Sequence, residues 1–259
     1  MSYISYSEFK IWSDCAYKHK LKYVDRINEF QGNEYTAFGT SVHSVCEVGV
    51  FDDSVDLQKH FEETFLKELQ KLPEKAKKEF REDLIKDMRV QGKELALEAI
   101  PALREYFDND FEVVSVEERL NESIDGIDTH TFKGFVDLVI KSKDKYHIID
   151  WKTCGWGWDS RKKNDKMITY QLTFYKNYFA KKHGIDPADV ETYFALLKRT
   201  AKTNKVEIFR VTSGKIKTQN ALKMLGNSVH NIVNENYVKN RTSCTEGYGC
   251  EFYNTKHCQ

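Results

Sequence analysis

Two apolar, strand-like stretches of this chain each contain a carboxylate, and this feature constrains the fold more than any other. Residues 134–140 read Gly-Phe-Val-Asp-Leu-Val-Ile, with Asp137 at the centre. Residues 146–153 read Tyr-His-Ile-Ile-Asp-Trp-Lys-Thr, with Asp150 and Lys152 two positions apart. Such runs are typical of buried strands, in which an unpaired charge is costly. We therefore expect these acids to be paired or to bind a cation.

The spacing of Asp150 and Lys152 predicts that both side chains leave the same face of a strand. Two acids and a lysine that converge on one sheet face would suit a hard divalent cation and an anionic substrate. Phosphodiester hydrolysis fits this set best. Alone, an Asp-x-Lys spacing is also consistent with a surface ion pair on an edge strand, so the surrounding sequence has to decide.

The pattern resembles the PD-(D/E)XK nuclease superfamily, in which an acid after the first strand of a hairpin precedes Asp-x-Lys on the next strand. The proline that usually precedes the first acid is missing here. Two further elements resemble the RecB-like members, namely Gly39-x-x-x-His43 upstream and Gln171-x-x-x-Tyr175 downstream. Gln171 and Tyr175 would share a helix face. His43 or Tyr175 alone would be read as a packing residue, but four elements in the same order favour the family.

The resemblance implies metal-assisted hydrolysis. The implied ligands of Mg²⁺ or Mn²⁺ are His43, Asp137, Asp150 and the backbone carbonyl of Trp151. The metal would lower the pKa of a bound water and shield the charge on the phosphate. Lys152 would orient that water or stabilise the transition state.

Four other residues receive expected roles from the same resemblance. Gln171 would hold the backbone of the active site, and Tyr175 would contact the DNA strand. Glu117, at the end of the first strand, would lie behind the ligands or simply face solvent. Glu47 lies one helical turn beyond His43 and would also reach the metal.

Three tryptophans flank the Asp-x-Lys strand. Trp156 and Trp158 are interleaved with Gly155 and Gly157, which indicates a loop rather than core packing. Exposed indoles there would stack on unpaired bases, at roughly 1–3 kcal/mol each. Trp151 lies within the strand and is expected to be buried.

The six cysteines are Cys15, Cys46, Cys154, Cys244, Cys250 and Cys258. The first six residues are neither basic nor continuously apolar, so we expect no secretory signal. A cytoplasmic chain would keep its thiols reduced, and clustered thiols there are typical of metal binding.

RecB-like nucleases of the AddB type and CRISPR-associated single-strand exonucleases have one cysteine near the start and three near the end, which hold a [4Fe–4S] cluster. The implied ligands here are Cys15, Cys244, Cys250 and Cys258. The last three are spaced Cys-x₅-Cys-x₇-Cys instead of the usual Cys-x₂-Cys-x₅-Cys. Structural zinc, with His257 as a substitute ligand, and unmetallated thiols remain alternatives. Cys46 and Cys154 are expected to be small buried hydrophobes.

Composition excludes some classes of protein. The 259 residues have a net charge of zero, which argues against a purely electrostatic nucleic-acid binder but not against a nuclease. No apolar run approaches the roughly 18 residues of a membrane span, so no membrane association is expected.

The order of elements is α/β (α+β) and matches the αβββαβ restriction-endonuclease-like core of the superfamily. The expected helices lie at residues 5–21, 35–51, 54–107 in two pieces, 167–182 and 216–238. The expected strands lie at residues 112–118, 134–140, 146–153, 192–197 and 206–211, with a turn region at 121–128. We expect one nuclease unit over residues 1–259 with a helical N-terminal insertion or cap at 54–107. A cysteine-rich tail at 241–259 would be stapled to Cys15 through the metal.

These observations predict a cytoplasmic, metal-dependent DNA nuclease, foremost an exonuclease that prefers single strands or free ends. A structure-specific endonuclease of the same fold is the first alternative. The second is a catalytically silent module, in which the cluster holds a DNA-binding scaffold for a larger complex, and the third is a zinc-stabilised binding protein. A protein partner in recombination, replication or a CRISPR-type complex is also expected.

Overall fold

The computed structural model describes residues 2–27, 30–245 and 249–259. The strands are β1 (Ser2–Ser5), β2 (Glu112–Ile124), β3 (Ile127–Ser142), β4 (Lys145–Cys154), β5 (Val190–Lys198) and β6 (Val206–Val211). The longer helices are α1 (Tyr6–Asp14), α3 (Glu34–Gly49), α4 (Leu57–Lys71), α6 (Glu82–Tyr106), α8 (Lys166–His183) and α9 (Lys215–Val233). The shorter helices are α2 (Ala16–His19), α5 (Glu74–Lys78) and α7 (Ser160–Asn164), with a π-helical turn at Lys20–Val24 and 3₁₀ turns at Pro187–Asp189 and Arg241–Cys244.

Within the described residues, six strands form one mixed sheet. β2, β3 and β4 are antiparallel neighbours, β4 and β5 are parallel, and β6 returns antiparallel to β5. β2 follows one edge of β3. On the other edge, β1 pairs with His130–Lys133 and β4 pairs with Leu138–Ser142. Residues 134–137 of β3 therefore have no paired strand on that edge in the described chain, and the sheet forks there.

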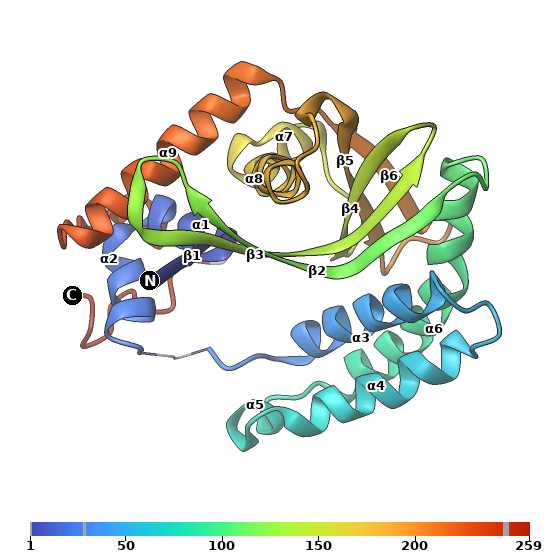
Figure 1. Cartoon of the computed structure of the whole chain (residues 1–259). Coiled ribbons are helices and arrows are strands. Elements are labelled where there is room, and N and C mark those ends of the chain that lie inside the picture. Colours follow the sequence, from blue (N-terminus) through green and yellow to red (C-terminus); the bar gives the residue numbers. More distant parts are fainter. Residues whose placement is uncertain (1, 28–29, 246–248) are drawn as a thin grey trace.

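Helices cover both faces of the sheet (Figure 1). α8 and α9 lie over one face, above a core that includes Phe132, Ile148 and Phe194. α3, α4 and α6 lie over the other face, above Leu138 and Ile149. The second group packs closely, because a Cβ on Gly92 of α6 would lie only 1.9 Å from the Phe61 ring. Each fully buried phenylalanine contributes roughly 1.5–3 kcal/mol to folding.

The predicted α/β class and the antiparallel meander of three strands are confirmed. The helical stretch predicted at 54–107 is present, but it forms three helices, α4, α5 and α6, instead of two pieces. Ser5 caps α1 by accepting a hydrogen bond from the main-chain nitrogen of Glu8.

Three predicted boundaries were wrong, and one strand was missed. The turn region at 121–128 shrinks to Asp125–Gly126, because β2 and β3 continue to pair almost to the turn. The helix expected from residue 5 to 21 breaks at Cys15, which has an extended backbone. The last helix ends at Val233 instead of residue 238. β1 was not predicted, since four residues form a strand only through their pairing with β3.

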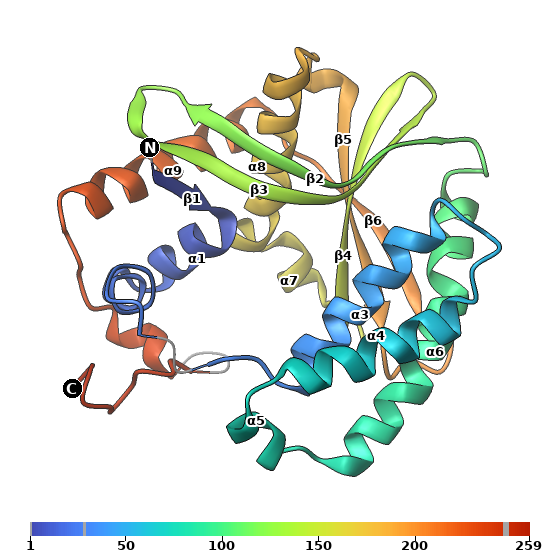
Figure 2. The ribbon, with the colours of Figure 1, turned by 60° about the horizontal axis from the view of Figure 1, so that its bottom comes forward.

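The chain's last segment packs beside the first helices (Figure 2). Residues 246–248 of the predicted tail at 241–259 lie outside the described residues. No helix in the described part is both long and apolar enough to cross a membrane.

Candidate active site

The end of the β3–β4 ladder brings Asp137 and Asp150 together. The last paired residues are Leu138 and Ile149, so these two acids would form the next pair. The ladder does not continue, and the main-chain N–H of Trp151 donates instead to Oδ2 of Asp137 at 2.8 Å. The Asp137 carboxylate thus takes the place of a strand partner at the fork of the sheet.

The β2–β3 hairpin bends at the same level. Val136 packs beneath α8, whereas Leu138 packs beneath α3, although residues two apart in a regular strand share one face. The flanking pairs place Glu117 opposite Asp137, and Glu117 has a φ of 49°. Such left-handed backbone in a residue other than glycine costs about 1–3 kcal/mol and is typical of functional sites. The bend therefore presents Glu117 beside Asp137.

Three side chains gather into a group that could hold a metal ion. His43, Glu117 and Asp137 each offer a ligand atom within 4.8 Å of the others. His43 comes from α3, and its Nδ1 lies 3.6 Å from Oδ2 of Asp137. An imidazole nitrogen with carboxylate oxygens suits Mn²⁺, and the oxygens suit Mg²⁺. Glu117, which sequence reasoning placed behind the ligands or in solvent, belongs to this group.

Asp150 and Lys152 lie beside this group on the face covered by α8. Their side chains form an ion pair, as expected for residues two apart on one strand. Asp150 is 1% exposed, and its Oδ2 contacts the lysine without accepting a hydrogen bond of good geometry. A buried carboxylate oxygen that is so poorly satisfied suits a cation. Asp150 is not within the three-residue group but adjoins it.

α8 holds Asp150 in place. Nε2 of Gln171 donates to Oδ1 of Asp150 at 2.8 Å and to the hydroxyl of Tyr175 at 3.1 Å. Gln171 was expected to hold the backbone, and it holds a carboxylate instead. Tyr175 is 6% exposed, and a Cβ on Gly134 would lie 2.8 Å from its ring. Tyr175 thus lies beneath the site, where the expected contact with a DNA strand does not fit.

Burial makes the site unfavourable for uncompensated negative charge. It raises the pKa of Asp137 well above its usual range, and the neighbouring Asp150 raises it further. Burial also raises the pKa of Glu117, with the charges of Glu47 and Asp150 contributing. It lowers the pKa of His43, which keeps the imidazole neutral and able to bind a metal. A bound divalent cation would compensate the two acids.

The tryptophans divide into buried and exposed. Trp151 is buried as expected, and its main-chain N–H donates to Asp137. Trp158 packs edge-on against Phe194, at 5.1 Å between ring centroids. Trp156 is 80% exposed. Of the two tryptophans predicted to stack on unpaired bases, Trp156 is therefore the one whose indole is accessible in the described structure.

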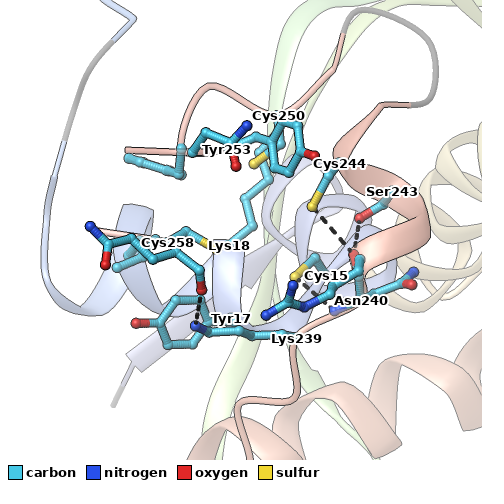
Figure 3. A pocket seen from close by; sticks show the side chains of 15 residues that line it. Cys15, Tyr17, Lys18, Lys239, Asn240, Ser243, Cys244, Cys250, Tyr253 and Cys258 are labelled. Atoms are coloured by element: carbon cyan, nitrogen blue, oxygen red, sulfur yellow. Dashed lines mark hydrogen bonds between the residues drawn. The ribbon is translucent and has the colours of Figure 1, made fainter. Parts of the chain in front are cut away.

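The remaining predicted ligands line a second, separate site. A cavity of about 90 Å³ is lined by Cys15, Cys244, Cys250 and Cys258 (Figure 3). The main-chain N–H of Asn240 donates to Sγ of Cys15 at 3.3 Å. Lys18 pairs with Glu251 at 2.8 Å, and the Tyr17 hydroxyl donates to the carbonyl of His257 at 3.2 Å. These contacts fasten the tail to the first helices around the four thiols.

Among the described residues, no three cysteine sulfurs lie within 4.8 Å of one another. Cys46 and Cys154 lie elsewhere: Cys46 on α3 is buried, as predicted, whereas Cys154 at the end of β4 is only partly buried, and burial raises the pKa of both thiols.

Comparison with known proteins gives two informative matches. The family model of the PD-(D/E)XK nuclease superfamily matches residues 3–255. The crystal structure of a candidate exonuclease from Eubacterium rectale is similar, with a TM-score of 0.60 and 13% identity over 94% of this chain and 86% of that chain. SSO0001 is 15% identical over 60% of this chain and 63% of that chain, but its TM-score of 0.35 is too low to support an inference. No curated protein matches the sequence.

Proposed function

The chain belongs to the PD-(D/E)XK nuclease superfamily, and from this premise we propose that it is a Mg²⁺- or Mn²⁺-dependent deoxyribonuclease. The main support is the meeting of two sets of side chains at the sheet fork. One set is the group of His43, Glu117 and Asp137, and the other is the Asp150–Lys152 pair. An ordinary structural ion pair would not need a neutral imidazole, three neighbouring acids and a strained backbone in one place.

The residues of the fork have distinct proposed roles. His43, Glu117 and Asp137 would bind the cation, with Asp150 and the carbonyl of Trp151 beside them. The bound cation would lower the pKa of a water ligand and compensate charge on the phosphate. The partly exposed Lys152 would orient the attacking water or stabilise the developing negative charge.

Within this activity we propose an exonuclease that prefers single-stranded DNA. The similar structure from Eubacterium rectale is described as a candidate exonuclease, which supports this choice over an endonuclease of the same fold. A silent DNA-binding module is disfavoured, because such a module would not need the complete set of ionisable groups. We further propose that residues 1–259 act as one unit in the cytoplasm, with DNA as the main partner and a protein of recombination, replication or a CRISPR-type complex as a candidate second partner.

The test is digestion of end-labelled linear and circular single-stranded DNA, and of linear duplex, with Mn²⁺ or with EDTA. We expect metal-dependent loss of the linear single strand and survival of the circle. Asp150→Ala should abolish this digestion. Asp83→Ala, which removes a fully exposed carboxylate on α6, should leave it unchanged. Equal digestion in EDTA would sink the proposal, and cleavage of the circle would make the protein an endonuclease.

We also propose that the four cysteines of the second site hold a [4Fe–4S] cluster. The cavity that all four cysteines line and the contacts that fasten the tail to the first helices support it. Its contribution would be structural, since ligation would join the first helices to the tail. Protein purified without oxygen should be brown and contain iron. A colourless protein with stoichiometric zinc would contradict the cluster and support the zinc alternative.

A further inference from the structure

A groove of about 830 Å³ opens beside the active site at the end of β4. We call it the aromatic groove, and its main lining residues are Phe30, Tyr35, Phe38, Thr153, Trp156 and Arg199. One wall is α3, which contains His43, and the other continues from β4, which contains Asp150. The walls meet closely, because a Cβ on Gly39 would lie 3.4 Å from Oγ1 of Thr153. Two of the elements that build the active site, α3 and β4, therefore extend into the groove.

Trp156 is an exposed side chain on a fixed backbone. The carbonyls of Cys154 and Gly155 accept hydrogen bonds from the main-chain nitrogens of Arg199 and Thr200, at 2.8 and 3.0 Å. Gly157 follows with a φ of +128°, which lets the chain turn back directly after the indole. A large aromatic surface that is already held in place loses little conformational entropy when a ligand covers it.

Further planar groups line the groove, namely the rings of α3 and the guanidinium of Arg199 that lies against them. The guanidinium carbon of Arg199 lies 5.6 Å from the centroid of the Tyr35 ring and 6.0 Å from that of Phe38. Gln91 accepts a hydrogen bond from Arg199 at 2.6 Å, and Arg81 donates one to the Tyr35 hydroxyl at 2.8 Å. Tyr35 nevertheless stays 45% exposed. Aromatic rings and guanidinium planes are the groups on which unpaired bases stack, and a guanidinium also pairs with phosphate.

We propose that the aromatic groove binds the bases of an unpaired nucleic-acid strand that leads into the metal site. This inference rests on the proposed function, because the bound strand is the substrate of that site. Trp156 follows Lys152 by four residues, which at about 3.3 Å per residue is at most about 13 Å, a span of a few nucleotides. A duplex keeps its bases stacked on each other, so an indole here favours a single strand.

The charge of the groove also favours nucleic acid over a protein. Among the described residues that line it, Arg199 is the charged side chain and none is acidic. Exposed aromatics can also dock a protein. The groove, however, adjoins the helix of His43 and the strand of Asp150 and Lys152, where the proposed function places the scissile phosphate, which makes a polyanionic strand the better occupant.

The experiment measures binding in EDTA, where cleavage is prevented, by fluorescence anisotropy. The probes are a labelled oligothymidylate and an abasic strand with the same number of phosphates. Trp156→Ala should weaken oligothymidylate binding by about 5- to 150-fold and leave the abasic strand unaffected. Trp156→Phe should retain most of the affinity. Phe51→Ala, which removes an exposed ring just beyond the far end of α3, is the matched control and should change neither.

Wild-type affinity of Trp156→Ala for oligothymidylate would overturn the inference and leave the aromatic face to a protein partner. A wild-type protein that binds oligothymidylate no better than the abasic strand would overturn it as well. Cleavage assays in Mn²⁺ test the proposed function separately. If the wild type cleaves but Trp156→Ala binds normally, only the groove inference fails. If Trp156→Ala loses binding but the wild type cleaves nothing, the groove stands and the nuclease proposal fails.

Discussion

Replacing Asp137 by asparagine should separate the folding role of this residue from its metal role. The Asp137 carboxylate accepts the Trp151 N–H at the sheet fork, and an asparagine carbonyl can accept the same hydrogen bond. The substitution removes the negative charge next to His43 and Glu117, which a cation would require. We therefore expect Asp137→Asn to fold and to lose its affinity for Mn²⁺.

The expected magnitude follows from ligand linkage. Mn²⁺ at 100 times its dissociation constant should stabilise the wild type by about 2.7 kcal/mol. For a chain of this size that raises Tm by about 5–10 °C, since each kcal/mol is worth roughly 2–4 °C. Asp137→Asn should show almost none of this increase when both proteins are heated in EDTA and in Mn²⁺.

The pH dependence of the metal-free proteins provides a second test. Burial raises the folded-state pKa of Asp137 above its unfolded value of about 3.9. The unfolded state therefore loses its proton first, and this residue makes the metal-free wild type less stable as pH rises from about 4 through the raised folded pKa. Asp137→Asn should lack that decline. A variant that keeps the Mn²⁺-dependent rise in Tm, or that declines with pH in EDTA as steeply as the wild type, would refute this reasoning.

Four further substitutions, with Cys46→Ser as a control, test the remaining assignments. Lys152→Ala should keep the Mn²⁺-dependent rise in Tm yet lose most turnover, and an unchanged rate would assign the lysine to structure alone. His43→Ala should weaken Mn²⁺ binding in a calorimetric titration without unfolding the protein. Gln171→Leu leaves a buried Asp150 oxygen without its donor, so denaturant unfolding without metal should show a loss of about 1–3 kcal/mol. Cys15→Ser should lower metal content and Tm together, whereas Cys46→Ser should leave metal content unchanged, and wild-type stability of Cys15→Ser would exclude a metal staple.

Local periodicity was enough to predict several features of the site. A strand alternates faces every residue, so the Asp150–Lys152 pairing could be predicted from their spacing alone. A helix brings residues four apart together, and Gln171 and Tyr175 are in hydrogen-bonding contact as that rule requires. The meander of β2, β3 and β4 was also predictable from local sequence, because strands joined by short connections usually pair with each other.

Contacts between distant segments decided the rest. Glu117 reaches Asp137 because the β2–β3 register sets them opposite each other and both strands bend there, and neither register nor bend has a local sequence signal. Tyr175 is buried because α8 packs onto β3 at Gly134, so its depth depends on a residue far away in the chain. Cys15 meets the C-terminal cysteines only after the tail folds back onto the first helices. The sequence alone determined which chemical groups were present and which neighbours shared a face, because those follow from short-range geometry. Tertiary structure decided which groups share a site, because strand register and packing are set by the whole fold.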